Sequence, residues 1–165
     1  MSHPGERGES ALQNAELKVD LMKTFSLDEA QGLLPVLEAL LRRAIEAKTS
    51  AEQLEMELQE FGQRIFFSGG MQVDPAQVGR KRAALRAAVQ QAKDVVEEID
   101  SIGVQVKDLD TGLLDFPCQI GEEIVLLCWK LGEPRIAHWH SLDAGFQGRQ
   151  PLDERFSRLW PEKPN

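Results

Sequence analysis

Two long series of apolar residues, spaced alternately three and four positions apart, constrain the fold of this chain most strongly. The first runs from Pro35 to about Phe67 with one irregular step near Ala47. Its members are Leu37, Leu41, Ala44, Ala47, Ala51, Leu54, Leu58, Phe61 and Ile65. Such spacing is typical of a long helix that packs along another helix. Glu, Gln, Arg and Lys fill the outward positions, as in a solvated coiled coil.

The second series follows a short loop. Ser68-Gly69-Gly70 ends the first helix, and Asp74-Pro75 begins the next, with aspartate at the cap and proline at the first helical position. Its apolar positions are Val78, Leu85, Val89, Ala92, Val96 and Ile99. Together the two series predict an antiparallel helical hairpin, with arms of roughly 40–50 Å at ~1.5 Å per residue. We expect a scaffolding or dimerisation arm, and a partner-binding groove is the alternative.

The residues before the hairpin predict a helix start and a kink. Ser26 can cap a helix and Glu29 completes a capping box. Gly32 and Pro35 then interrupt the pattern, so we expect a short helix that kinks into the long one. Residues 1–23 bury too little apolar surface to order themselves, which predicts a disordered or loosely docked tail.

After Gly103 the period becomes that of strands. Val104–Lys107 alternates, and three further strands are expected at Phe116–Ile120, Ile124–Lys130 and Arg135–Ser141. A loop is expected over 143–151 and a short turn or helix over 153–160. The predicted fold class is therefore α+β: a long antiparallel helical hairpin packed on a small, mostly antiparallel sheet. We expect one domain over 24–160, with the hairpin at 24–102, the β-rich part at 103–151 and a polar end at 161–165.

Charge and composition exclude some classes of function. A net charge of −8 argues against nucleic acid as a partner. There is neither an apolar run of ~20 residues for a membrane span nor a secretion-signal pattern, so we expect a cytoplasmic protein. A tight turn at Gly121-Glu122 places Cys128 opposite Asp115, out of register with Cys118, so both cysteines are expected to be reduced core thiols.

Two histidines suggest a metal site. If the last two strands are joined by a four-residue loop, Leu127 faces His138 and Val125 faces His140. His138, His140 and Glu123 then share one face and could hold zinc, iron or manganese, while Trp129 and Trp139 lie on opposite faces. A loop one residue longer or shorter flips one strand and brings in Glu122 instead of Glu123. The alternative is that the histidines, which flank Trp139, are hydrogen-bonded core residues.

The acidic loops allow a second kind of site. Asp108, Asp110, Asp115 and Asp143 lie among glycines, where aspartate usually caps a turn. The alternative is a small anionic or polar ligand held by Arg149 and a carboxylate. The chain has no GxGxxG, GxxxxGK[ST] or GxSxG motif, so no nucleotide or esterase chemistry is indicated. A Cys–His nucleophile pair is conceivable, but thiols inside apolar strands are usually inert.

The segments GLLDFP, LLCWKLGEP, HWH and GFQGRQP resemble a mainly bacterial family known as domain of unknown function 2203. The resemblance covers roughly Phe25 to Pro151 and implies no particular activity or cofactor. The positions that match its pattern are Asp115, Cys128, Trp129, Gly132, Glu133, His140, Gly145 and Arg149.

From these residues we predict a non-catalytic module that oligomerises and binds a small polar ligand or a protein partner. The ligand-binding residues are expected to be Asp115, Glu133, His140 and Arg149, and no catalytic residue is assigned. A sheet that is apolar on both faces needs covering, which favours a homodimer. The alternative function is a metal-dependent hydrolase that uses His138 and His140.

Overall fold

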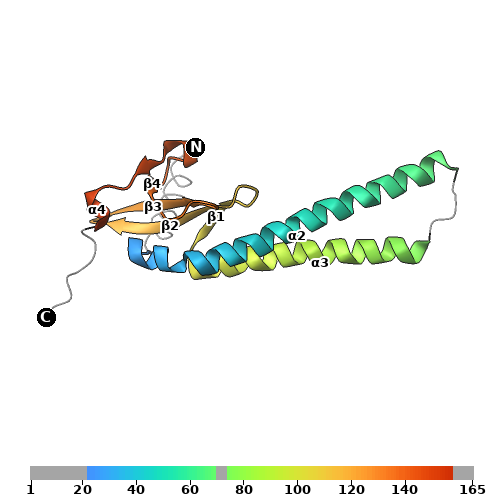
Figure 1. Ribbon diagram of the computed structural model, residues 1–165, viewed down its shortest axis with the longest axis horizontal. Helices are drawn as coiled ribbons and strands as arrows, with labels where there is room; N and C mark the ends of the chain where they lie inside the picture. The colour runs from blue at the N-terminus through green and yellow to red at the C-terminus, as the bar shows by residue number, and fades with distance from the viewer. Residues whose placement is uncertain (1–21, 70–73, 158–165) are drawn as a thin grey trace, which may run out of the picture. The chain divides into compact units, whose positions relative to one another are not determined.

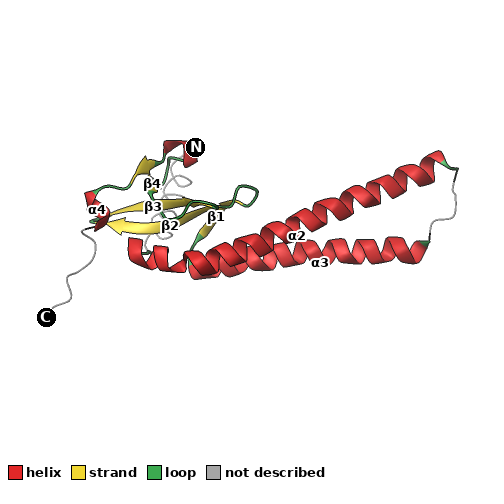
Figure 2. Cartoon of the chain, in the orientation of Figure 1, coloured by secondary structure: helices red, strands yellow, loops and turns green. Residues whose placement is uncertain are grey.

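The computed structural model describes residues 22–69 and 74–157 (Figures 1 and 2). Two long helices and a five-stranded sheet confirm the α+β class. The described residues form two compact units: one contains 22–33, 103–105 and 114–157, and the other contains 34–69, 74–102 and 106–113. The predicted single domain stays a prediction. Most of the predicted tail, and the polar end at 161–165, lie outside the described residues.

The first long helix, α2, spans Leu27–Phe67. Its start is the predicted one, because the Oγ of Ser26 accepts a hydrogen bond of 3.1 Å from the backbone N–H of Glu29. No separate short helix is formed, since α2 passes through Pro35 as a single element, and the predicted kink there stays a prediction. Proline removes one backbone donor, and a helix of 41 residues retains enough other bonds and packing to continue.

The second long helix, α3, spans Pro75–Ile102. Asp74 caps it as predicted, accepting a hydrogen bond of 3.0 Å from the N–H of Ala76. Gly103 ends it with a φ of +102°, a conformation that glycine adopts without strain. Seam residues of the hairpin, Leu37, Leu41 and Ile99 among them, are fully buried.

Five strands form one sheet in chain order. They are β1 (Gln105–Asp108), β2 (Leu113–Ile120), β3 (Glu123–Lys130), β4 (His138–His140) and β5 (Gln150–Pro151). A 3-10 turn, η1 (Phe146–Gly148), precedes β5, and a short helix, α4 (Glu154–Ser157), follows it. Strand β5 was expected to be loop, but it pairs antiparallel with β4, placing His138 opposite Pro151 and Trp139 opposite Gln150.

The predicted pairing of the last two long strands is wrong by one residue. In the structure, Leu126 lies opposite His140 and Cys128 opposite His138. The reason is a wider connection than the four-residue loop assumed above. The backbone N–H of Ile136 donates to the side chain of Gln31, at 3.0 Å, and β4 begins later, at His138. Both histidines therefore share the face of Cys128.

The same shift corrects the placement of the tryptophans. Leu127 lies opposite Trp139, so Trp129 and Trp139 are on one face and not on opposite faces. On that side the ring of Phe156, from α4, lies 5.8 Å from the ring of Trp139. Consecutive residues of β2 and β3 are buried, which confirms that both faces of the central strands are covered.

The cysteines behave as predicted: Cys118 and Cys128 are both free and buried. Phe25, just before α2, is hydrogen-bonded to β2, since its N–H donates to the carbonyl of Pro117 at 2.7 Å. In the described part of the chain, no helix combines the length and apolar character needed to cross a membrane.

Candidate metal site

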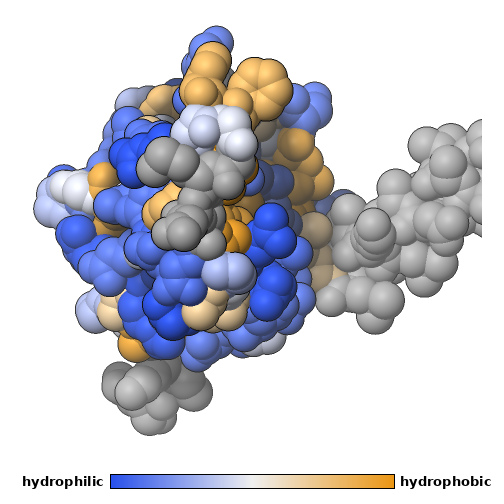
Figure 3. Space-filling view, turned by 90° about the vertical axis from the view of Figure 1, so that its right-hand side faces the viewer, coloured by the Kyte–Doolittle hydropathy of each residue, from blue (hydrophilic) through white to orange (hydrophobic). Residues whose placement is uncertain are grey.

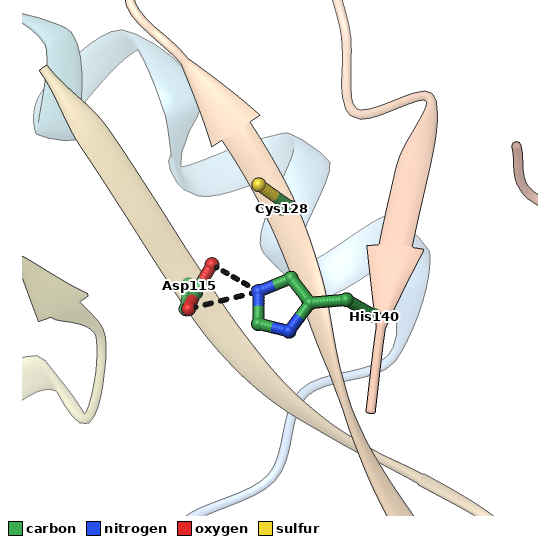
Figure 4. Close-up of side chains that lie close together, drawn as sticks. All are labelled: Asp115, Cys128 and His140. Carbon is green, nitrogen blue, oxygen red and sulfur yellow. Dashed lines mark hydrogen bonds and ion pairs between the residues drawn. The ribbon is translucent and has the colours of Figure 1, made fainter. Parts of the chain in front are cut away.

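A buried contact between an imidazole and a carboxylate lies at the centre of the sheet. The Nε2 atom of His140, on β4, is 3.1 Å from both carboxylate oxygens of Asp115, on β2 (Figure 4). The Nδ1 atom of the same ring is 2.8 Å from the backbone carbonyl of Ser141. Both residues are almost inaccessible to solvent, at 1% exposure for Asp115 and 3% for His140. Because both ring nitrogens face oxygens, a ring protonated at both nitrogens satisfies every contact.

Cys128, on the central strand β3, completes a cluster with this pair. One ligand-type atom from each of Asp115, Cys128 and His140 lies within 4.8 Å of the other two. In Figure 4 the three side chains come from three neighbouring strands, with the imidazole of His140 facing the carboxylate of Asp115 and the thiol of Cys128 beside them. Alternation along each strand explains the convergence, because Cys128 and His140 are on the same face in the observed register.

Burial controls the chemistry of the thiol. Loss of hydration and, to a smaller extent, the neighbouring carboxylate of Asp115 together raise the pKa of Cys128 to about 11, although Arg149 opposes both. Burial likewise raises the pKa of Cys118 to about 11, with a smaller contribution from Glu29. Without a metal, each cysteine is therefore a neutral thiol at neutral pH.

Arg149, which follows η1, links this cluster to the β3–β4 turn. Its two terminal nitrogens each donate a hydrogen bond of 3.1 Å to one carboxylate oxygen of Glu133. Its guanidinium also lies 4.4 Å from the ring centre of Phe146 and interacts with the thiol of Cys128. The pair with Glu133 raises the pKa of Arg149. Paired and stacked in this way, the side chain of Arg149 is held in one position.

Glu133 fixes the turn itself. Its carboxylate accepts a hydrogen bond of 2.7 Å from the N–H of Lys130, and its carbonyl accepts one of 3.0 Å from the indole N–H of Trp129. Burial raises the pKa of Glu133, but the bonds from Arg149 and Lys130 outweigh it, so its pKa lies below the ordinary value. Glu133 is thus an ionised anchor for Arg149 and for the turn.

Comparison with known proteins places the chain in a family. The family model described as "Uncharacterized conserved protein (DUF2203)" matches residues 23–152. The chain belongs to this family. Searches of curated proteins and of solved structures gave no match. The matched range of this DUF2203 protein contains the whole cluster and both partners of the Arg149–Glu133 pair.

The structure brings together some of the predicted site residues of the DUF2203 protein and separates others. Asp115 and His140 are in direct contact, and Glu133 and Arg149 form a second pair that reaches Cys128. Their predicted role in ligand binding stays a prediction. The sequence-based interpretation expected Cys128 to be a core thiol, with a Cys–His nucleophile as the alternative, and did not count it among the metal ligands. The predicted strand pairing, which places Cys128 opposite Asp115, was a signal that could have included Cys128 in the site.

The predicted metal set His138, His140 and Glu123 is not assembled. Among the described residues, the group of ligand-type side chains close enough to share an ion contains His140 but neither of the other two. The Nδ1 atom of His138 is 3.9 Å from Glu133 and has no hydrogen-bond partner among the described residues. Glu123 is exposed and, with Glu122 and Asp143, lines a depression of about 620 Å³ beside the turn between β2 and β3.

The other acidic loop residues serve the turns. Asp108 accepts hydrogen bonds of 3.0 Å from the N–H of Asp110 and from the hydroxyl of Thr111. Asp110 forms an ion pair with Lys48 on α2. These contacts are the ones expected if the aspartates stabilise turns by accepting hydrogen bonds from nearby donors.

The geometry of the cluster excludes a cysteine–histidine nucleophile of the usual form. In such a triad, one ring nitrogen faces the thiol and the other faces the carboxylate. Here Nε2 faces Asp115 and Nδ1 faces a backbone carbonyl. With a raised pKa in addition, Cys128 is not activated for attack on a substrate.

Proposed function

We propose that this DUF2203 protein is a non-catalytic metal-binding module that holds a divalent transition metal between Asp115, Cys128 and His140. The observation that carries the proposal is the convergence of a carboxylate, a thiol and an imidazole within 4.8 Å of one another. Thiolate and imidazole donors favour zinc among the common divalent ions, and carboxylate completes a donor set that zinc accepts.

The orientation of His140 supports the same role. Metal-binding histidines usually donate their second ring N–H to a carbonyl or a carboxylate, which directs the other nitrogen at the ion. The contact from Nδ1 to the carbonyl of Ser141, at 2.8 Å, is of this kind. Binding of a divalent ion would release the protons on Nε2 of His140 and on the thiol of Cys128. The two positive charges of the ion would then balance the thiolate of Cys128 and the carboxylate of Asp115.

The burial of the cluster favours a structural role for the metal over a catalytic one. Three protein ligands also suit a hydrolytic zinc, which keeps its fourth position for water. A hydrolase, however, must admit its substrate to the ion, and Asp115, Cys128 and His140 have exposures of 1%, 0% and 3%. The cluster is closed, so we favour binding over hydrolysis.

The test is metal binding by untagged protein after dialysis against a chelator. Titration with Co²⁺ should give one equivalent bound, with a thiolate-to-cobalt absorption band, and Zn²⁺ should displace it. Asp115→Asn, Cys128→Ala and His140→Gln should each weaken zinc binding by about 10-fold or more.

Two matched controls make the test specific. Cys118→Ala removes a thiol that is equally buried, and His138→Gln removes the neighbouring histidine on the same strand. Neither should change affinity or the cobalt spectrum. Absence of stoichiometric binding would refute the proposal, and a loss in His138→Gln equal to that in His140→Gln would favour the metal set predicted from sequence.

A further inference from the structure

The distal half of the helical hairpin has no enclosed core. We define it as residues 52–69, at the end of α2, and 74–94, at the start of α3. None of these described residues is buried, and the seam positions Leu54, Leu58 and Leu85 are only half-buried. Nearer the other end of the hairpin, Leu37, Leu41 and their neighbours are enclosed. Two helices alone bury one narrow seam, whereas a bundle of four encloses its apolar positions.

Large apolar side chains are exposed along the same half. Phe66 and Phe67 are 81% and 83% exposed, and Met56 is 63% exposed. Val89, on α3, and Ile65, on α2, are also open to solvent. Figure 3 looks at the molecule from the end where α2 and α3 are connected and shows apolar side chains, in orange, among hydrophilic ones. Exposed apolar side chains gathered in one region mark an interaction surface more often than single ones do.

The charges of the distal half are divided between its helices. Residues 52–69 carry four carboxylates and one arginine, a net charge of −3. Residues 74–94 carry five basic and two acidic side chains, a net charge of +3. Among the described residues, Lys81 and Glu57 form the ion pair that joins the two helices within one chain. Most of the remaining charges are exposed, including Glu55 and Glu60 on α2 and Arg82 on α3.

We infer that the distal half is a dimerisation surface on which a second copy of this chain docks, so that two hairpins form a four-helix bundle. A surface with one acidic and one basic helix is self-complementary under two-fold symmetry. The acidic α2 of one copy lies along the basic α3 of the other, and the reverse contact follows automatically. The exposed apolar residues supply the contact between the copies, and the charges set its orientation. The distal half shares no residue with the cluster of Asp115, Cys128 and His140.

The test uses two variants, each with the charge of one helix reversed. One variant reverses the basic helix, Arg80→Glu/Arg82→Glu/Arg86→Glu, and gives both helices a net charge of −3. The other reverses the acidic helix, Glu52→Lys/Glu55→Lys/Glu60→Lys, and gives both helices +3. Lys81 and Glu57 are left in place to keep the hairpin closed. Sedimentation equilibrium of the full chain at low salt measures the mass of each variant and of an equimolar mixture.

Wild type should have a mass near twice 18.5 kDa. Each reversed variant alone should dimerise at least 10-fold more weakly, and the mixture should recover a heterodimer. Glu97→Lys/Glu98→Lys/Asp100→Lys, on exposed α3 positions outside the distal half, is the control and should dimerise like wild type. Helicity by circular dichroism checks that each variant is folded.

Three results would overturn the inference: a wild-type monomer at all concentrations, dimers that both reversals leave intact, or a mixture that stays monomeric while both variants are helical. A wild-type monomer that associates with an unrelated protein through this surface would count against the second copy as its occupant.

Discussion

The contact between Asp115 and His140 allows a quantitative prediction of the free energy of unfolding of metal-free protein. Their side chains are 3.1 Å apart at two atom pairs and shielded from water. A hydrogen bond to a buried carboxylate contributes about 1.5–3 kcal/mol net, and a buried carboxylate left without a partner costs its full desolvation. Removing one partner leaves the other buried and unpaired, so Asp115→Ala and His140→Ala should each destabilise the protein by about 3–5 kcal/mol.

The double variant Asp115→Ala/His140→Ala should cost less than the sum of the two. We expect a coupling energy of about 2–3 kcal/mol between the sites. Urea unfolding of the four proteins at neutral pH, in the presence of a chelator, measures it. A coupling energy under about 0.5 kcal/mol would refute the reasoning, because the two side chains would then not be an energetic unit.

The same unfolding assay separates the pair from the metal site. Zinc at 100 times its dissociation constant should stabilise the wild type by about 2.7 kcal/mol, and it should not stabilise a variant that lacks a ligand. If the pair is coupled but zinc adds nothing, the cluster is a structural ion pair and the proposed function is wrong.

Two further predictions concern thiols and backbone. In metal-free protein the folded state keeps the protons of Cys118 and Cys128 up to a pKa of about 11, whereas the unfolded chain releases them near 9.0. Stability should therefore fall as pH rises from 9 to 11, by at most about 3 kcal/mol per thiol. In each Cys→Ala variant, the free energy of unfolding should decrease less between pH 9 and pH 11. An unchanged decrease would contradict the raised pKa of that thiol. Gly103→Ala forces φ of +102° on alanine and puts its Cβ 3.2 Å from Lys23, so thermal unfolding should show a loss of about 1–3 kcal/mol. Gly62→Ala, inside α2 with open space around it, should instead be neutral or stabilising by up to about 1 kcal/mol.

Local chemistry made the helices and most strands predictable. Ser26 and Asp74 bond the first amides of their helices wherever the rest of the chain lies, and Gly103 ends a helix by its own conformational freedom. Pro35 was misjudged because its local cost was weighed without the packing of a long helix. A short-range preference yields when distant contacts supply more free energy.

The register of β3 and β4 could not be predicted for a different reason. It depends on Gln31, more than one hundred positions away in the sequence, which takes the N–H of Ile136, and on Glu133, whose side chain holds the turn. A shift of one residue moves His140 from a face shared with Glu123 to the face of Cys128. The residue types of the site were therefore identifiable, but their partners depended on long-range contacts.

The placement of the cluster on three strands has a consequence for biosynthesis. Asp115 is translated before Cys128 and His140, and Arg149, which reaches the thiol, is among the last described residues to be made. Helices α2 and α3 precede all of them in the chain. On a ribosome, the hairpin can therefore form before the Asp115–Cys128–His140 cluster is complete, and a product truncated before Arg149 would carry the helices without the residue that reaches the thiol.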